Sequence, residues 1–211
     1  MRPPVVCLLL LALACSSAPR RADTVILASG ADLQSANPLL TTHPLARQVQ
    51  RYALLVTLVR YDSTLAPVPY LARWWRWSKD SSTITMGIYA GLSWHDGAPT
   101  TARDAAWTLE MARNPATGYP RQTDLAALRS ATAPDDTTLV LEFSRPVPRM
   151  PDVLTDLALL PHHLLDSVPP ADLRRAAWNQ RPVGNGPFRF VAHEANRRWI
   201  FVRNPGFPAA L

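Results

Sequence analysis

The sequence predicts an α+β (mixed α/β) fold, and three observations lead to this class. The chain has 211 residues, of which 47% are hydrophobic and 18% charged, a composition that can bury a core. Segments with apolar residues at every second position are mixed with segments at helical spacing. Their order lacks the regular strand–helix–strand repetition of a parallel sheet.

The first elements are expected soon after residue 24. Residues 25–28 (VILA) form a β-branched and aliphatic run that ends at Ser29-Gly30, which predicts a buried strand followed by a turn. Residues 42–62 contain Pro44, a residue typical of a first helical turn, and after it apolar side chains recur at helical spacing. We expect one amphipathic helix over that range.

Residues 67–96 change to a period of two, which predicts two antiparallel strands joined by a turn at residues 79–82. Trp75 and Trp77 share one face of the first strand, which leaves Trp74 to face solvent or a ligand. Core packing is the favoured interpretation of these tryptophans, and a stacking platform for sugars or bases is the alternative. The turn at His95-Asp96-Gly97 ends the second strand, with a glycine able to take positive φ.

A second helix and further strands follow. Thr101 and Asp104 make a capping-box-like start for a helix that ends before Pro115 and packs on the strands. Residues 138–143 alternate as a strand after a turn at Asp135-Asp136. Residues 157–165 are mainly apolar and are interrupted by a proline, and two more strands are expected over residues 188–191 and 199–202.

The N-terminus predicts export. Arg2 precedes an uncharged apolar stretch over residues 5–14, which is shorter than the about 20 residues that span a bilayer. We expect a signal peptide over residues 1–14 and a linker over residues 15–24. The ending LALAC resembles a bacterial lipobox, which implies lipidation of Cys15, while Ala12 within it leaves ordinary signal peptidase as the alternative.

Charge and cysteine content exclude several function classes. The formal charge is +6, but the arginines are scattered and no nucleic-acid-binding motif accompanies them, so we expect no nucleic-acid partner. Both cysteines, Cys7 and Cys15, lie in the first fifteen residues. The remainder of the chain therefore has no thiolate for a disulfide or a metal.

Catalytic and metal chemistry are not expected. His162 and His163 are adjacent and lack a third ligand at fixed spacing. Asp152 and Asp156 fit the solvent face of a helix better than an acid–base pair. No nucleophile motif such as Gly-x-Ser-x-Gly is present. We predict no enzyme, no cofactor and no metal.

Several blocks carry a family resemblance. Residues 71–80 (LARWWRWSKD) resemble the "LAESWEVSDDG" segment of the family 5 solute-binding proteins, the oligopeptide and dipeptide receptors of ABC transporters, and residues 92–104 (LSWHDGAPTTARD) resemble the family's "VKFHDGTPFTAEDV". Residues 182–190 (PVGNGPFRF) are similar to "PVGTGPYKF", and residues 203–207 are similar to "RNPDYW". The blocks stand in family order. Ser81 replaces a usual glycine, and Asn185 replaces threonine.

The resemblance implies a fold and a function. Residues 25–211 would form the first, N-terminal lobe of a type II periplasmic-binding-protein-like fold, with the second lobe missing. The chain would then be the substrate-binding component of an ABC importer that captures peptides or similar small solutes outside the cytoplasmic membrane. Its partners would be the solute, the permease subunits and a membrane reached through the N-terminal lipid only. The alternative is a truncated, non-transporting envelope interaction lipoprotein.

The resemblance also implies where solute binds. The turn after the family's first strand and the turn that contains Asn185 would lie near the cleft between lobes, where backbone groups hold an extended peptide like an added strand. The expected ligand-binding residues are Ala31, Asp32, Leu33, Ser35, Gly184 and Asn185.

Overall fold

A computed structural model describes residues 25–211 of the chain. The predicted signal peptide, the linker over residues 15–24 and the lipidated Cys15 lie outside the described residues. The described residues divide into the end of a first unit, residues 25–30, and a compact second unit, Ala31–Leu211. The second unit holds every helix and strand of the described residues.

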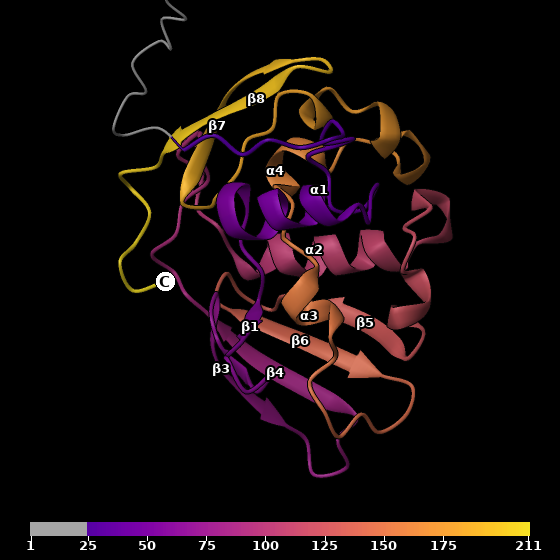
Figure 1. Cartoon of the computed structure of the whole chain (residues 1–211). Coiled ribbons are helices and arrows are strands. Elements are labelled where there is room, and N and C mark those ends of the chain that lie inside the picture. Colours follow the sequence, from indigo (N-terminus) through magenta and orange to yellow (C-terminus); the bar gives the residue numbers. More distant parts are fainter. Residues whose placement is uncertain (1–24) are drawn as a thin grey trace, which may run out of the picture. The chain divides into compact units, whose positions relative to one another are not determined.

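A four-stranded antiparallel sheet forms one layer of this second unit, in the order β3-β4-β6-β5 (Figure 1). Its strands are β3 (Ala72–Trp77), β4 (Thr83–Ile88), β5 (Leu128–Thr132) and β6 (Thr138–Phe143). The predicted hairpin is confirmed, because Trp75 pairs with Met86 and Trp77 with Ile84 across β3 and β4. Trp74 lies on the other face and keeps 50% of its surface exposed.

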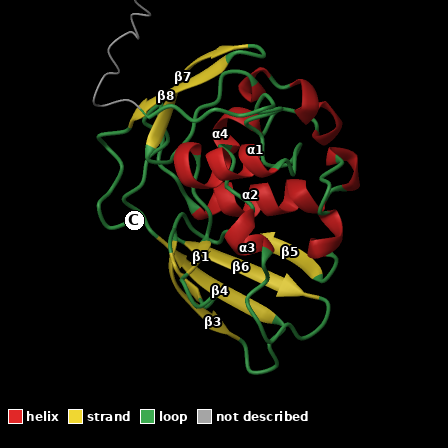
Figure 2. Cartoon of the chain, in the orientation of Figure 1, coloured by secondary structure: helices red, strands yellow, loops and turns green. Residues whose placement is uncertain are grey.

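Helix α2 (Ala102–Arg113) covers the inner face of the sheet, as Figure 2 shows. The predicted capping box is present at its start: the backbone N–H of Thr101 donates to Oδ2 of Asp104 at 2.8 Å. Ala105 and Leu109 are buried on the side of α2 that packs against β5 and β6. The helix ends before Pro115, as predicted.

The prediction of one helix over residues 42–62 is wrong. Helix α1 spans Pro44–Val49 and passes into a π-helical turn, Gln50–Leu54, closed by a hydrogen bond of 2.9 Å from Leu55 N to Gln50 O. Residues 54–58 are buried, and the Leu54 and Val56 carbonyls bind distant segments, with Leu159 N donating to Val56 O at 2.9 Å. These long-range bonds outweigh the local helical spacing. Strand β1 (Val59–Tyr61) follows and pairs with β2 (Pro67–Pro69).

The predicted strand over residues 25–28 is also wrong. These residues have no strand conformation, and Val25 keeps 90% of its surface exposed. An apolar run becomes a strand only where another strand supplies hydrogen-bond partners. No strand of the described residues pairs with residues 25–28.

The last third of the chain contains short helices and a hairpin. Helices α3 (Val153–Asp156) and α4 (His162–Leu165) flank the buried apolar residues 157–160. Strands β7 (Phe188–Glu194) and β8 (Arg198–Arg203) form an antiparallel hairpin, which confirms the two predicted C-terminal strands. The remaining helical elements are short 3₁₀ segments at Pro115–Thr117, Gln122–Leu125, Pro170–Arg175 and Ala177–Asn179.

No helix within residues 25–211 has the length and apolar character to cross a membrane.

Candidate functional site

The predicted ligand-binding residues Gly184 and Asn185 belong to a turn that we call the Gly-Asn-Gly turn (residues 184–186). It lies against the end of the π-helical turn, where the backbone N–H groups of Asn185 and Gly186 donate to Leu54 O at 3.1 and 2.9 Å. One carbonyl at a helix end thus accepts two hydrogen bonds from a segment 130 residues away in the chain, which satisfies an orphan acceptor of the helix terminus.

Both glycines are required by close approach. A Cβ on Gly184 would lie 2.0 Å from Leu54 O, and a Cβ on Gly186 would lie 2.4 Å from Ala53 O. Neither glycine has positive φ, so the missing side chain, rather than backbone freedom, explains the residue type.

Asn185 fixes the turn from inside the protein. Its side chain is fully buried, its Oδ1 accepts from Val56 N at 3.1 Å, and its Nδ2 donates to Thr100 Oγ1 at 3.3 Å. A buried amide with donors and acceptors engaged contributes stability and fixes local geometry.

The ring of His95 spans the two glycines. The N–H of Gly184 donates to Nδ1 at 3.2 Å, and Nε2 lies 3.0 Å from Gly186 O. These partners define the neutral tautomer with its proton on Nε2. Burial lowers the pKa of His95, and the nearby Arg189 charge acts in the same direction. This role of His95 could not be predicted from the sequence, where the residue is marked only by its place in a family block.

The other predicted residues belong to an N-terminal segment (residues 31–35), in which Leu33 and Ser35 are buried and Ala31 is exposed. The Asp32 carboxylate accepts hydrogen bonds from Asn196 N at 2.9 Å, Leu33 N at 2.7 Å and Trp199 Nε1 at 2.8 Å. These donors, led by the Asn196 N–H, lower the pKa of Asp32 to about 2, and burial opposes them. The segment is therefore tied to the β7–β8 hairpin.

The π-helical turn supports both predicted segments. At its start, the Gln50 side chain donates to Ser35 O at 3.0 Å, and at its end Leu54 O accepts from the Gly-Asn-Gly turn. Gln34 borders an open hollow of about 400 Å³ next to the N-terminal segment, together with His43, whose Nδ1 is buried without a partner. The structure thus attaches both segments to one element, a feature that the sequence did not predict.

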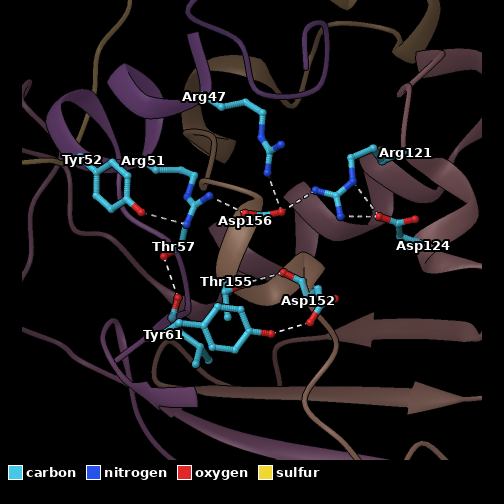
Figure 3. A network of polar contacts seen from close by, with 11 residues as sticks. Arg47, Arg51, Tyr52, Thr57, Tyr61, Arg121, Asp124, Asp152, Thr155 and Asp156 are labelled. Atoms are coloured by element: carbon cyan, nitrogen blue, oxygen red, sulfur yellow. Dashed lines mark hydrogen bonds and ion pairs between the residues drawn. The ribbon is translucent and has the colours of Figure 1, made fainter. Parts of the chain in front are cut away.

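A second polar cluster surrounds Asp156 (Figure 3). Three guanidinium groups reach its carboxylate: those of Arg47 at 2.6 Å, Arg51 at 2.5 Å and Arg121 at 2.5 Å. Burial acts to raise the pKa of Asp156, but the hydrogen bond from Arg121 and the arginine charges keep it below its usual range. The expectation that Asp156 lies on a solvent-facing helix surface is wrong, because only 19% of its side chain is exposed.

The paired histidines have separate environments. His163 lies 2.8 Å from the Asp96 carboxylate, and the His162 ring packs beside Trp107. Within residues 25–211, no three histidine, cysteine or acidic side chains converge as metal ligands.

Comparisons with known proteins agree with this fold. The family described as bacterial extracellular solute-binding proteins, family 5 Middle, matches residues 66–209. A Brucella ovis protein named as an ABC transporter peptide-binding protein is 39% identical over 152 residues, covering 71% of this chain and 29% of that protein. The periplasmic oligopeptide-binding protein OppA of Haemophilus influenzae is 28% identical over 200 residues, covering 86% of this chain and 36% of OppA.

Solved structures show the same likeness. NikZ from Campylobacter jejuni, in complex with Ni(L-His), has a TM-score of 0.77 at 26% identity, covering 88% of this chain and 36% of NikZ. Haemophilus influenzae OppA, in complex with RPPGFSPFR, has a TM-score of 0.74 at 28% identity, covering 84% of this chain and 37% of OppA. The mixed helix and sheet fold thus resembles part of the OppA and NikZ fold. The chain spans about a third of the length of these relatives, and it belongs to family 5 of the bacterial extracellular solute-binding proteins.

Proposed function

We propose that this chain is part of the substrate-binding component of an ABC importer, which captures peptides or similar small solutes outside the cytoplasmic membrane. The observation that carries the proposal is the match of residues 66–209 to a solute-binding family, together with relatives named for peptide binding. The component acts by binding and release, and catalysis has no part in it.

The proposed solute contacts come from the N-terminal segment and the Gly-Asn-Gly turn. The backbone of residues 31–35 would line the site for an extended peptide, with Leu33 N held by the Asp32 carboxylate and Ser35 O by the Gln50 side chain. Asp32 would hold that segment in place, since its carboxylate already accepts bonds from the β7–β8 hairpin. Gly184 and Asn185 would shape the wall of the site, because Asn185 is buried and engaged internally.

Transport would require further partners. Closure of this lobe on a second lobe around the solute would present a new surface to the permease subunits. The lipid on Cys15 would hold the protein at the membrane surface, and the folded part would remain in the aqueous phase.

A ligand-dependent melting shift tests the solute proposal. The full-length product of the gene, without its signal peptide, would be heated with a panel that includes Ala-Ala-Ala, the nonapeptide RPPGFSPFR, nickel with histidine, and a sugar. A selective ligand at about 100 times its Kd stabilises the native state by about 2.7 kcal/mol, so a clear rise in Tm with peptides is expected.

The matched control is Asp172→Asn, a substitution at an exposed aspartate outside both proposed segments, which should keep the shift. If the protein melts cooperatively and no solute in the panel raises its Tm, the solute-binding proposal fails and the interaction lipoprotein becomes the better description.

Metabolic labelling tests the lipid anchor. Cells that express the chain would be grown with radioactive palmitate, and a labelled protein is expected in the membrane fraction. Cys15→Ser should abolish the label, whereas Cys7→Ser should keep it. Label that survives Cys15→Ser would contradict the anchor.

A further inference from the structure

His95 connects two backbone positions of the Gly-Asn-Gly turn through one ring. Its Nδ1 accepts from Gly184 N at 3.2 Å, and its Nε2 donates to Gly186 O at 3.0 Å. The backbone adds a third link, since His95 N donates to Gly184 O at 2.7 Å. A Cβ on Gly184 would also lie 3.0 Å from Cε1 of the ring, so the ring and the turn are packed tightly together.

Only the uncharged ring satisfies this arrangement. A protonated imidazole carries N–H donors on both nitrogens, and the donor on Nδ1 would then face the N–H of Gly184. Two donors in contact lose their hydrogen bond and repel each other. The ring or the turn would have to move away to relieve the contact.

We infer that His95 is a positioning residue whose neutral ring fixes the Gly-Asn-Gly turn, so that solute capture weakens when His95 becomes charged. The inference rests on the proposed function for its effect on solute, while the effect on the turn stands on geometry alone.

The surroundings of the ring set the conditions for its titration. Burial of the ring favours its neutral form, and so does the charge of Arg189. Arg189 belongs to strand β7, and its guanidinium donates to His95 O at 3.2 Å. The hydrogen bond to the Gly186 carbonyl and, to a smaller extent, the Asp96 carboxylate favour the charged ring, and Asp96 is itself paired with His163 of helix α4 at 2.8 Å. The pKa of His95 lies below its ordinary value of 6.5 as a result, with burial the largest cause. The turn is therefore held at neutral pH and released only when the pH falls below the lowered pKa of His95.

Nuclear magnetic resonance of the folded protein tests the effect on the turn. The ring nitrogens of His95 should show the tautomer protonated on Nε2 at about pH 7.5. On lowering the pH, the backbone amides of Gly184 and Gly186 should shift with the same midpoint as the His95 ring. In His95→Gln, whose amide can both accept and donate, the two glycine amides should not follow this curve. His162→Gln, at a histidine whose ring packs on Trp107, should keep the wild-type response.

A His95 ring protonated on Nδ1 at neutral pH would overturn the inference, and this tautomer can be measured on the wild-type protein alone. Glycine amides that stay unchanged while the ring titrates, or that titrate equally in His95→Gln, would overturn it as well.

Calorimetry with the tripeptide Ala-Ala-Ala tests the effect on solute. Between about pH 8 and a pH below the His95 midpoint found by resonance, the wild-type Kd should rise roughly tenfold, as expected for the loss of one well-placed hydrogen bond, and the Kd of His95→Gln should change less than about twofold. Equal pH dependence in the two proteins would contradict the coupling. Absence of binding to the wild type at pH 8 would count against the proposed peptide function, while the resonance experiment would still decide the role of His95.

Discussion

Gly184 is the residue with the least space around it in the candidate site. Replacement by alanine would place a Cβ 2.0 Å from the Leu54 carbonyl, which itself accepts two hydrogen bonds. The turn would have to move away, and we expect Gly184→Ala to lower the free energy of unfolding by about 1–3 kcal/mol or more, as overpacking does. Urea denaturation measures the change.

Gly30→Ala is the matched control for that substitution, because a Cβ on Gly30 would meet no heavy atom within 4 Å. Its unfolding free energy should stay within about 0.5 kcal/mol of the wild-type value. Equal losses in the two variants would contradict the close-approach explanation for Gly184.

Ser81 carries backbone strain that a glycine would remove. It lies in the β3–β4 turn with φ of 57°, in the left-handed region that favours glycine, and the family block has a glycine there. Since a left-handed residue with a Cβ costs about 1–2 kcal/mol, Ser81→Gly should raise the unfolding free energy by about 0.5–1 kcal/mol after the entropic cost of glycine.

Ser81→Ala separates the backbone effect from the loss of the hydroxyl, because alanine keeps the Cβ. Thermal and urea denaturation of both variants should show a gain for glycine alone. A similar gain for alanine would assign the effect to the side chain.

At the scale of elements, Asp156 joins parts of the chain that are far apart in sequence. Of its three arginine partners, Arg47 belongs to α1, Arg51 belongs to the π-helical turn, and Arg121 immediately precedes the 3₁₀ turn at Gln122–Leu125 (Figure 3). Asp156→Asn removes the charge with little change of shape, and leaves three guanidinium groups close together. We expect a loss of roughly 1–3 kcal/mol in unfolding free energy, because a largely buried charge partner is removed.

Asp172→Asn provides the comparison, since Asp172 meets Arg175 at 3.7 Å in an exposed pair. Such pairs contribute little, so its unfolding free energy should change by less than about 0.5 kcal/mol. If Asp156→Asn is no more harmful than this control, the ion pairs that link α1 to α3 do not stabilise the fold.

The elements also explain which parts of the fold the sequence predicted. The hairpin of β3 and β4, the capping box of α2 and the β7–β8 hairpin follow from local patterns, and the structure confirms them. The helix predicted over residues 42–62 ends early, because the Leu54 and Val56 carbonyls bind segments more than 100 residues away. Contacts of that kind leave no periodic trace in a sequence.

The candidate site was predictable only in part. The family resemblance implied Asp32, Gly184 and Asn185 as site residues, but the pairing of Asp32 with the β7–β8 hairpin depends on three-dimensional packing. The role of His95 was not predicted for the same reason, since its partners stand about 90 residues further along the chain. Strand β1 was also missed, because three residues are too few for a pattern.

At the scale of the whole molecule, the carboxylates predict acid sensitivity. Asp32 and Asp156 both have folded-state pKa values below the usual 3.8, with Asp32 at about 2. A depressed carboxylate pKa stabilises the fold fully above the unfolded value, and this stabilisation is lost as the pH falls toward the folded value. The contribution of these two carboxylates to the unfolding free energy should therefore be constant above about pH 5 and should decline below about pH 4.

Urea denaturation at several pH values from 6 to 3 measures this decline. Asp32→Asn should be less stable at pH 6 and should lose less stability between pH 4 and pH 3 than the wild type does. A variant with an unchanged slope would show that Asp32 is not among the groups responsible.

The Leu54 carbonyl has a consequence for the order of folding. Its two partners in the Gly-Asn-Gly turn are synthesised 130 residues later, whereas the β3–β4 hairpin closes over a few residues. Contacts between distant residues require closure of long loops and form slowly, so the sheet and α2 can assemble first. Until residues 184–186 have been made, the Leu54 carbonyl at the end of the π-helical turn lacks the two donors that it accepts from them. The junction between these two segments should therefore be among the last contacts of this fold to form.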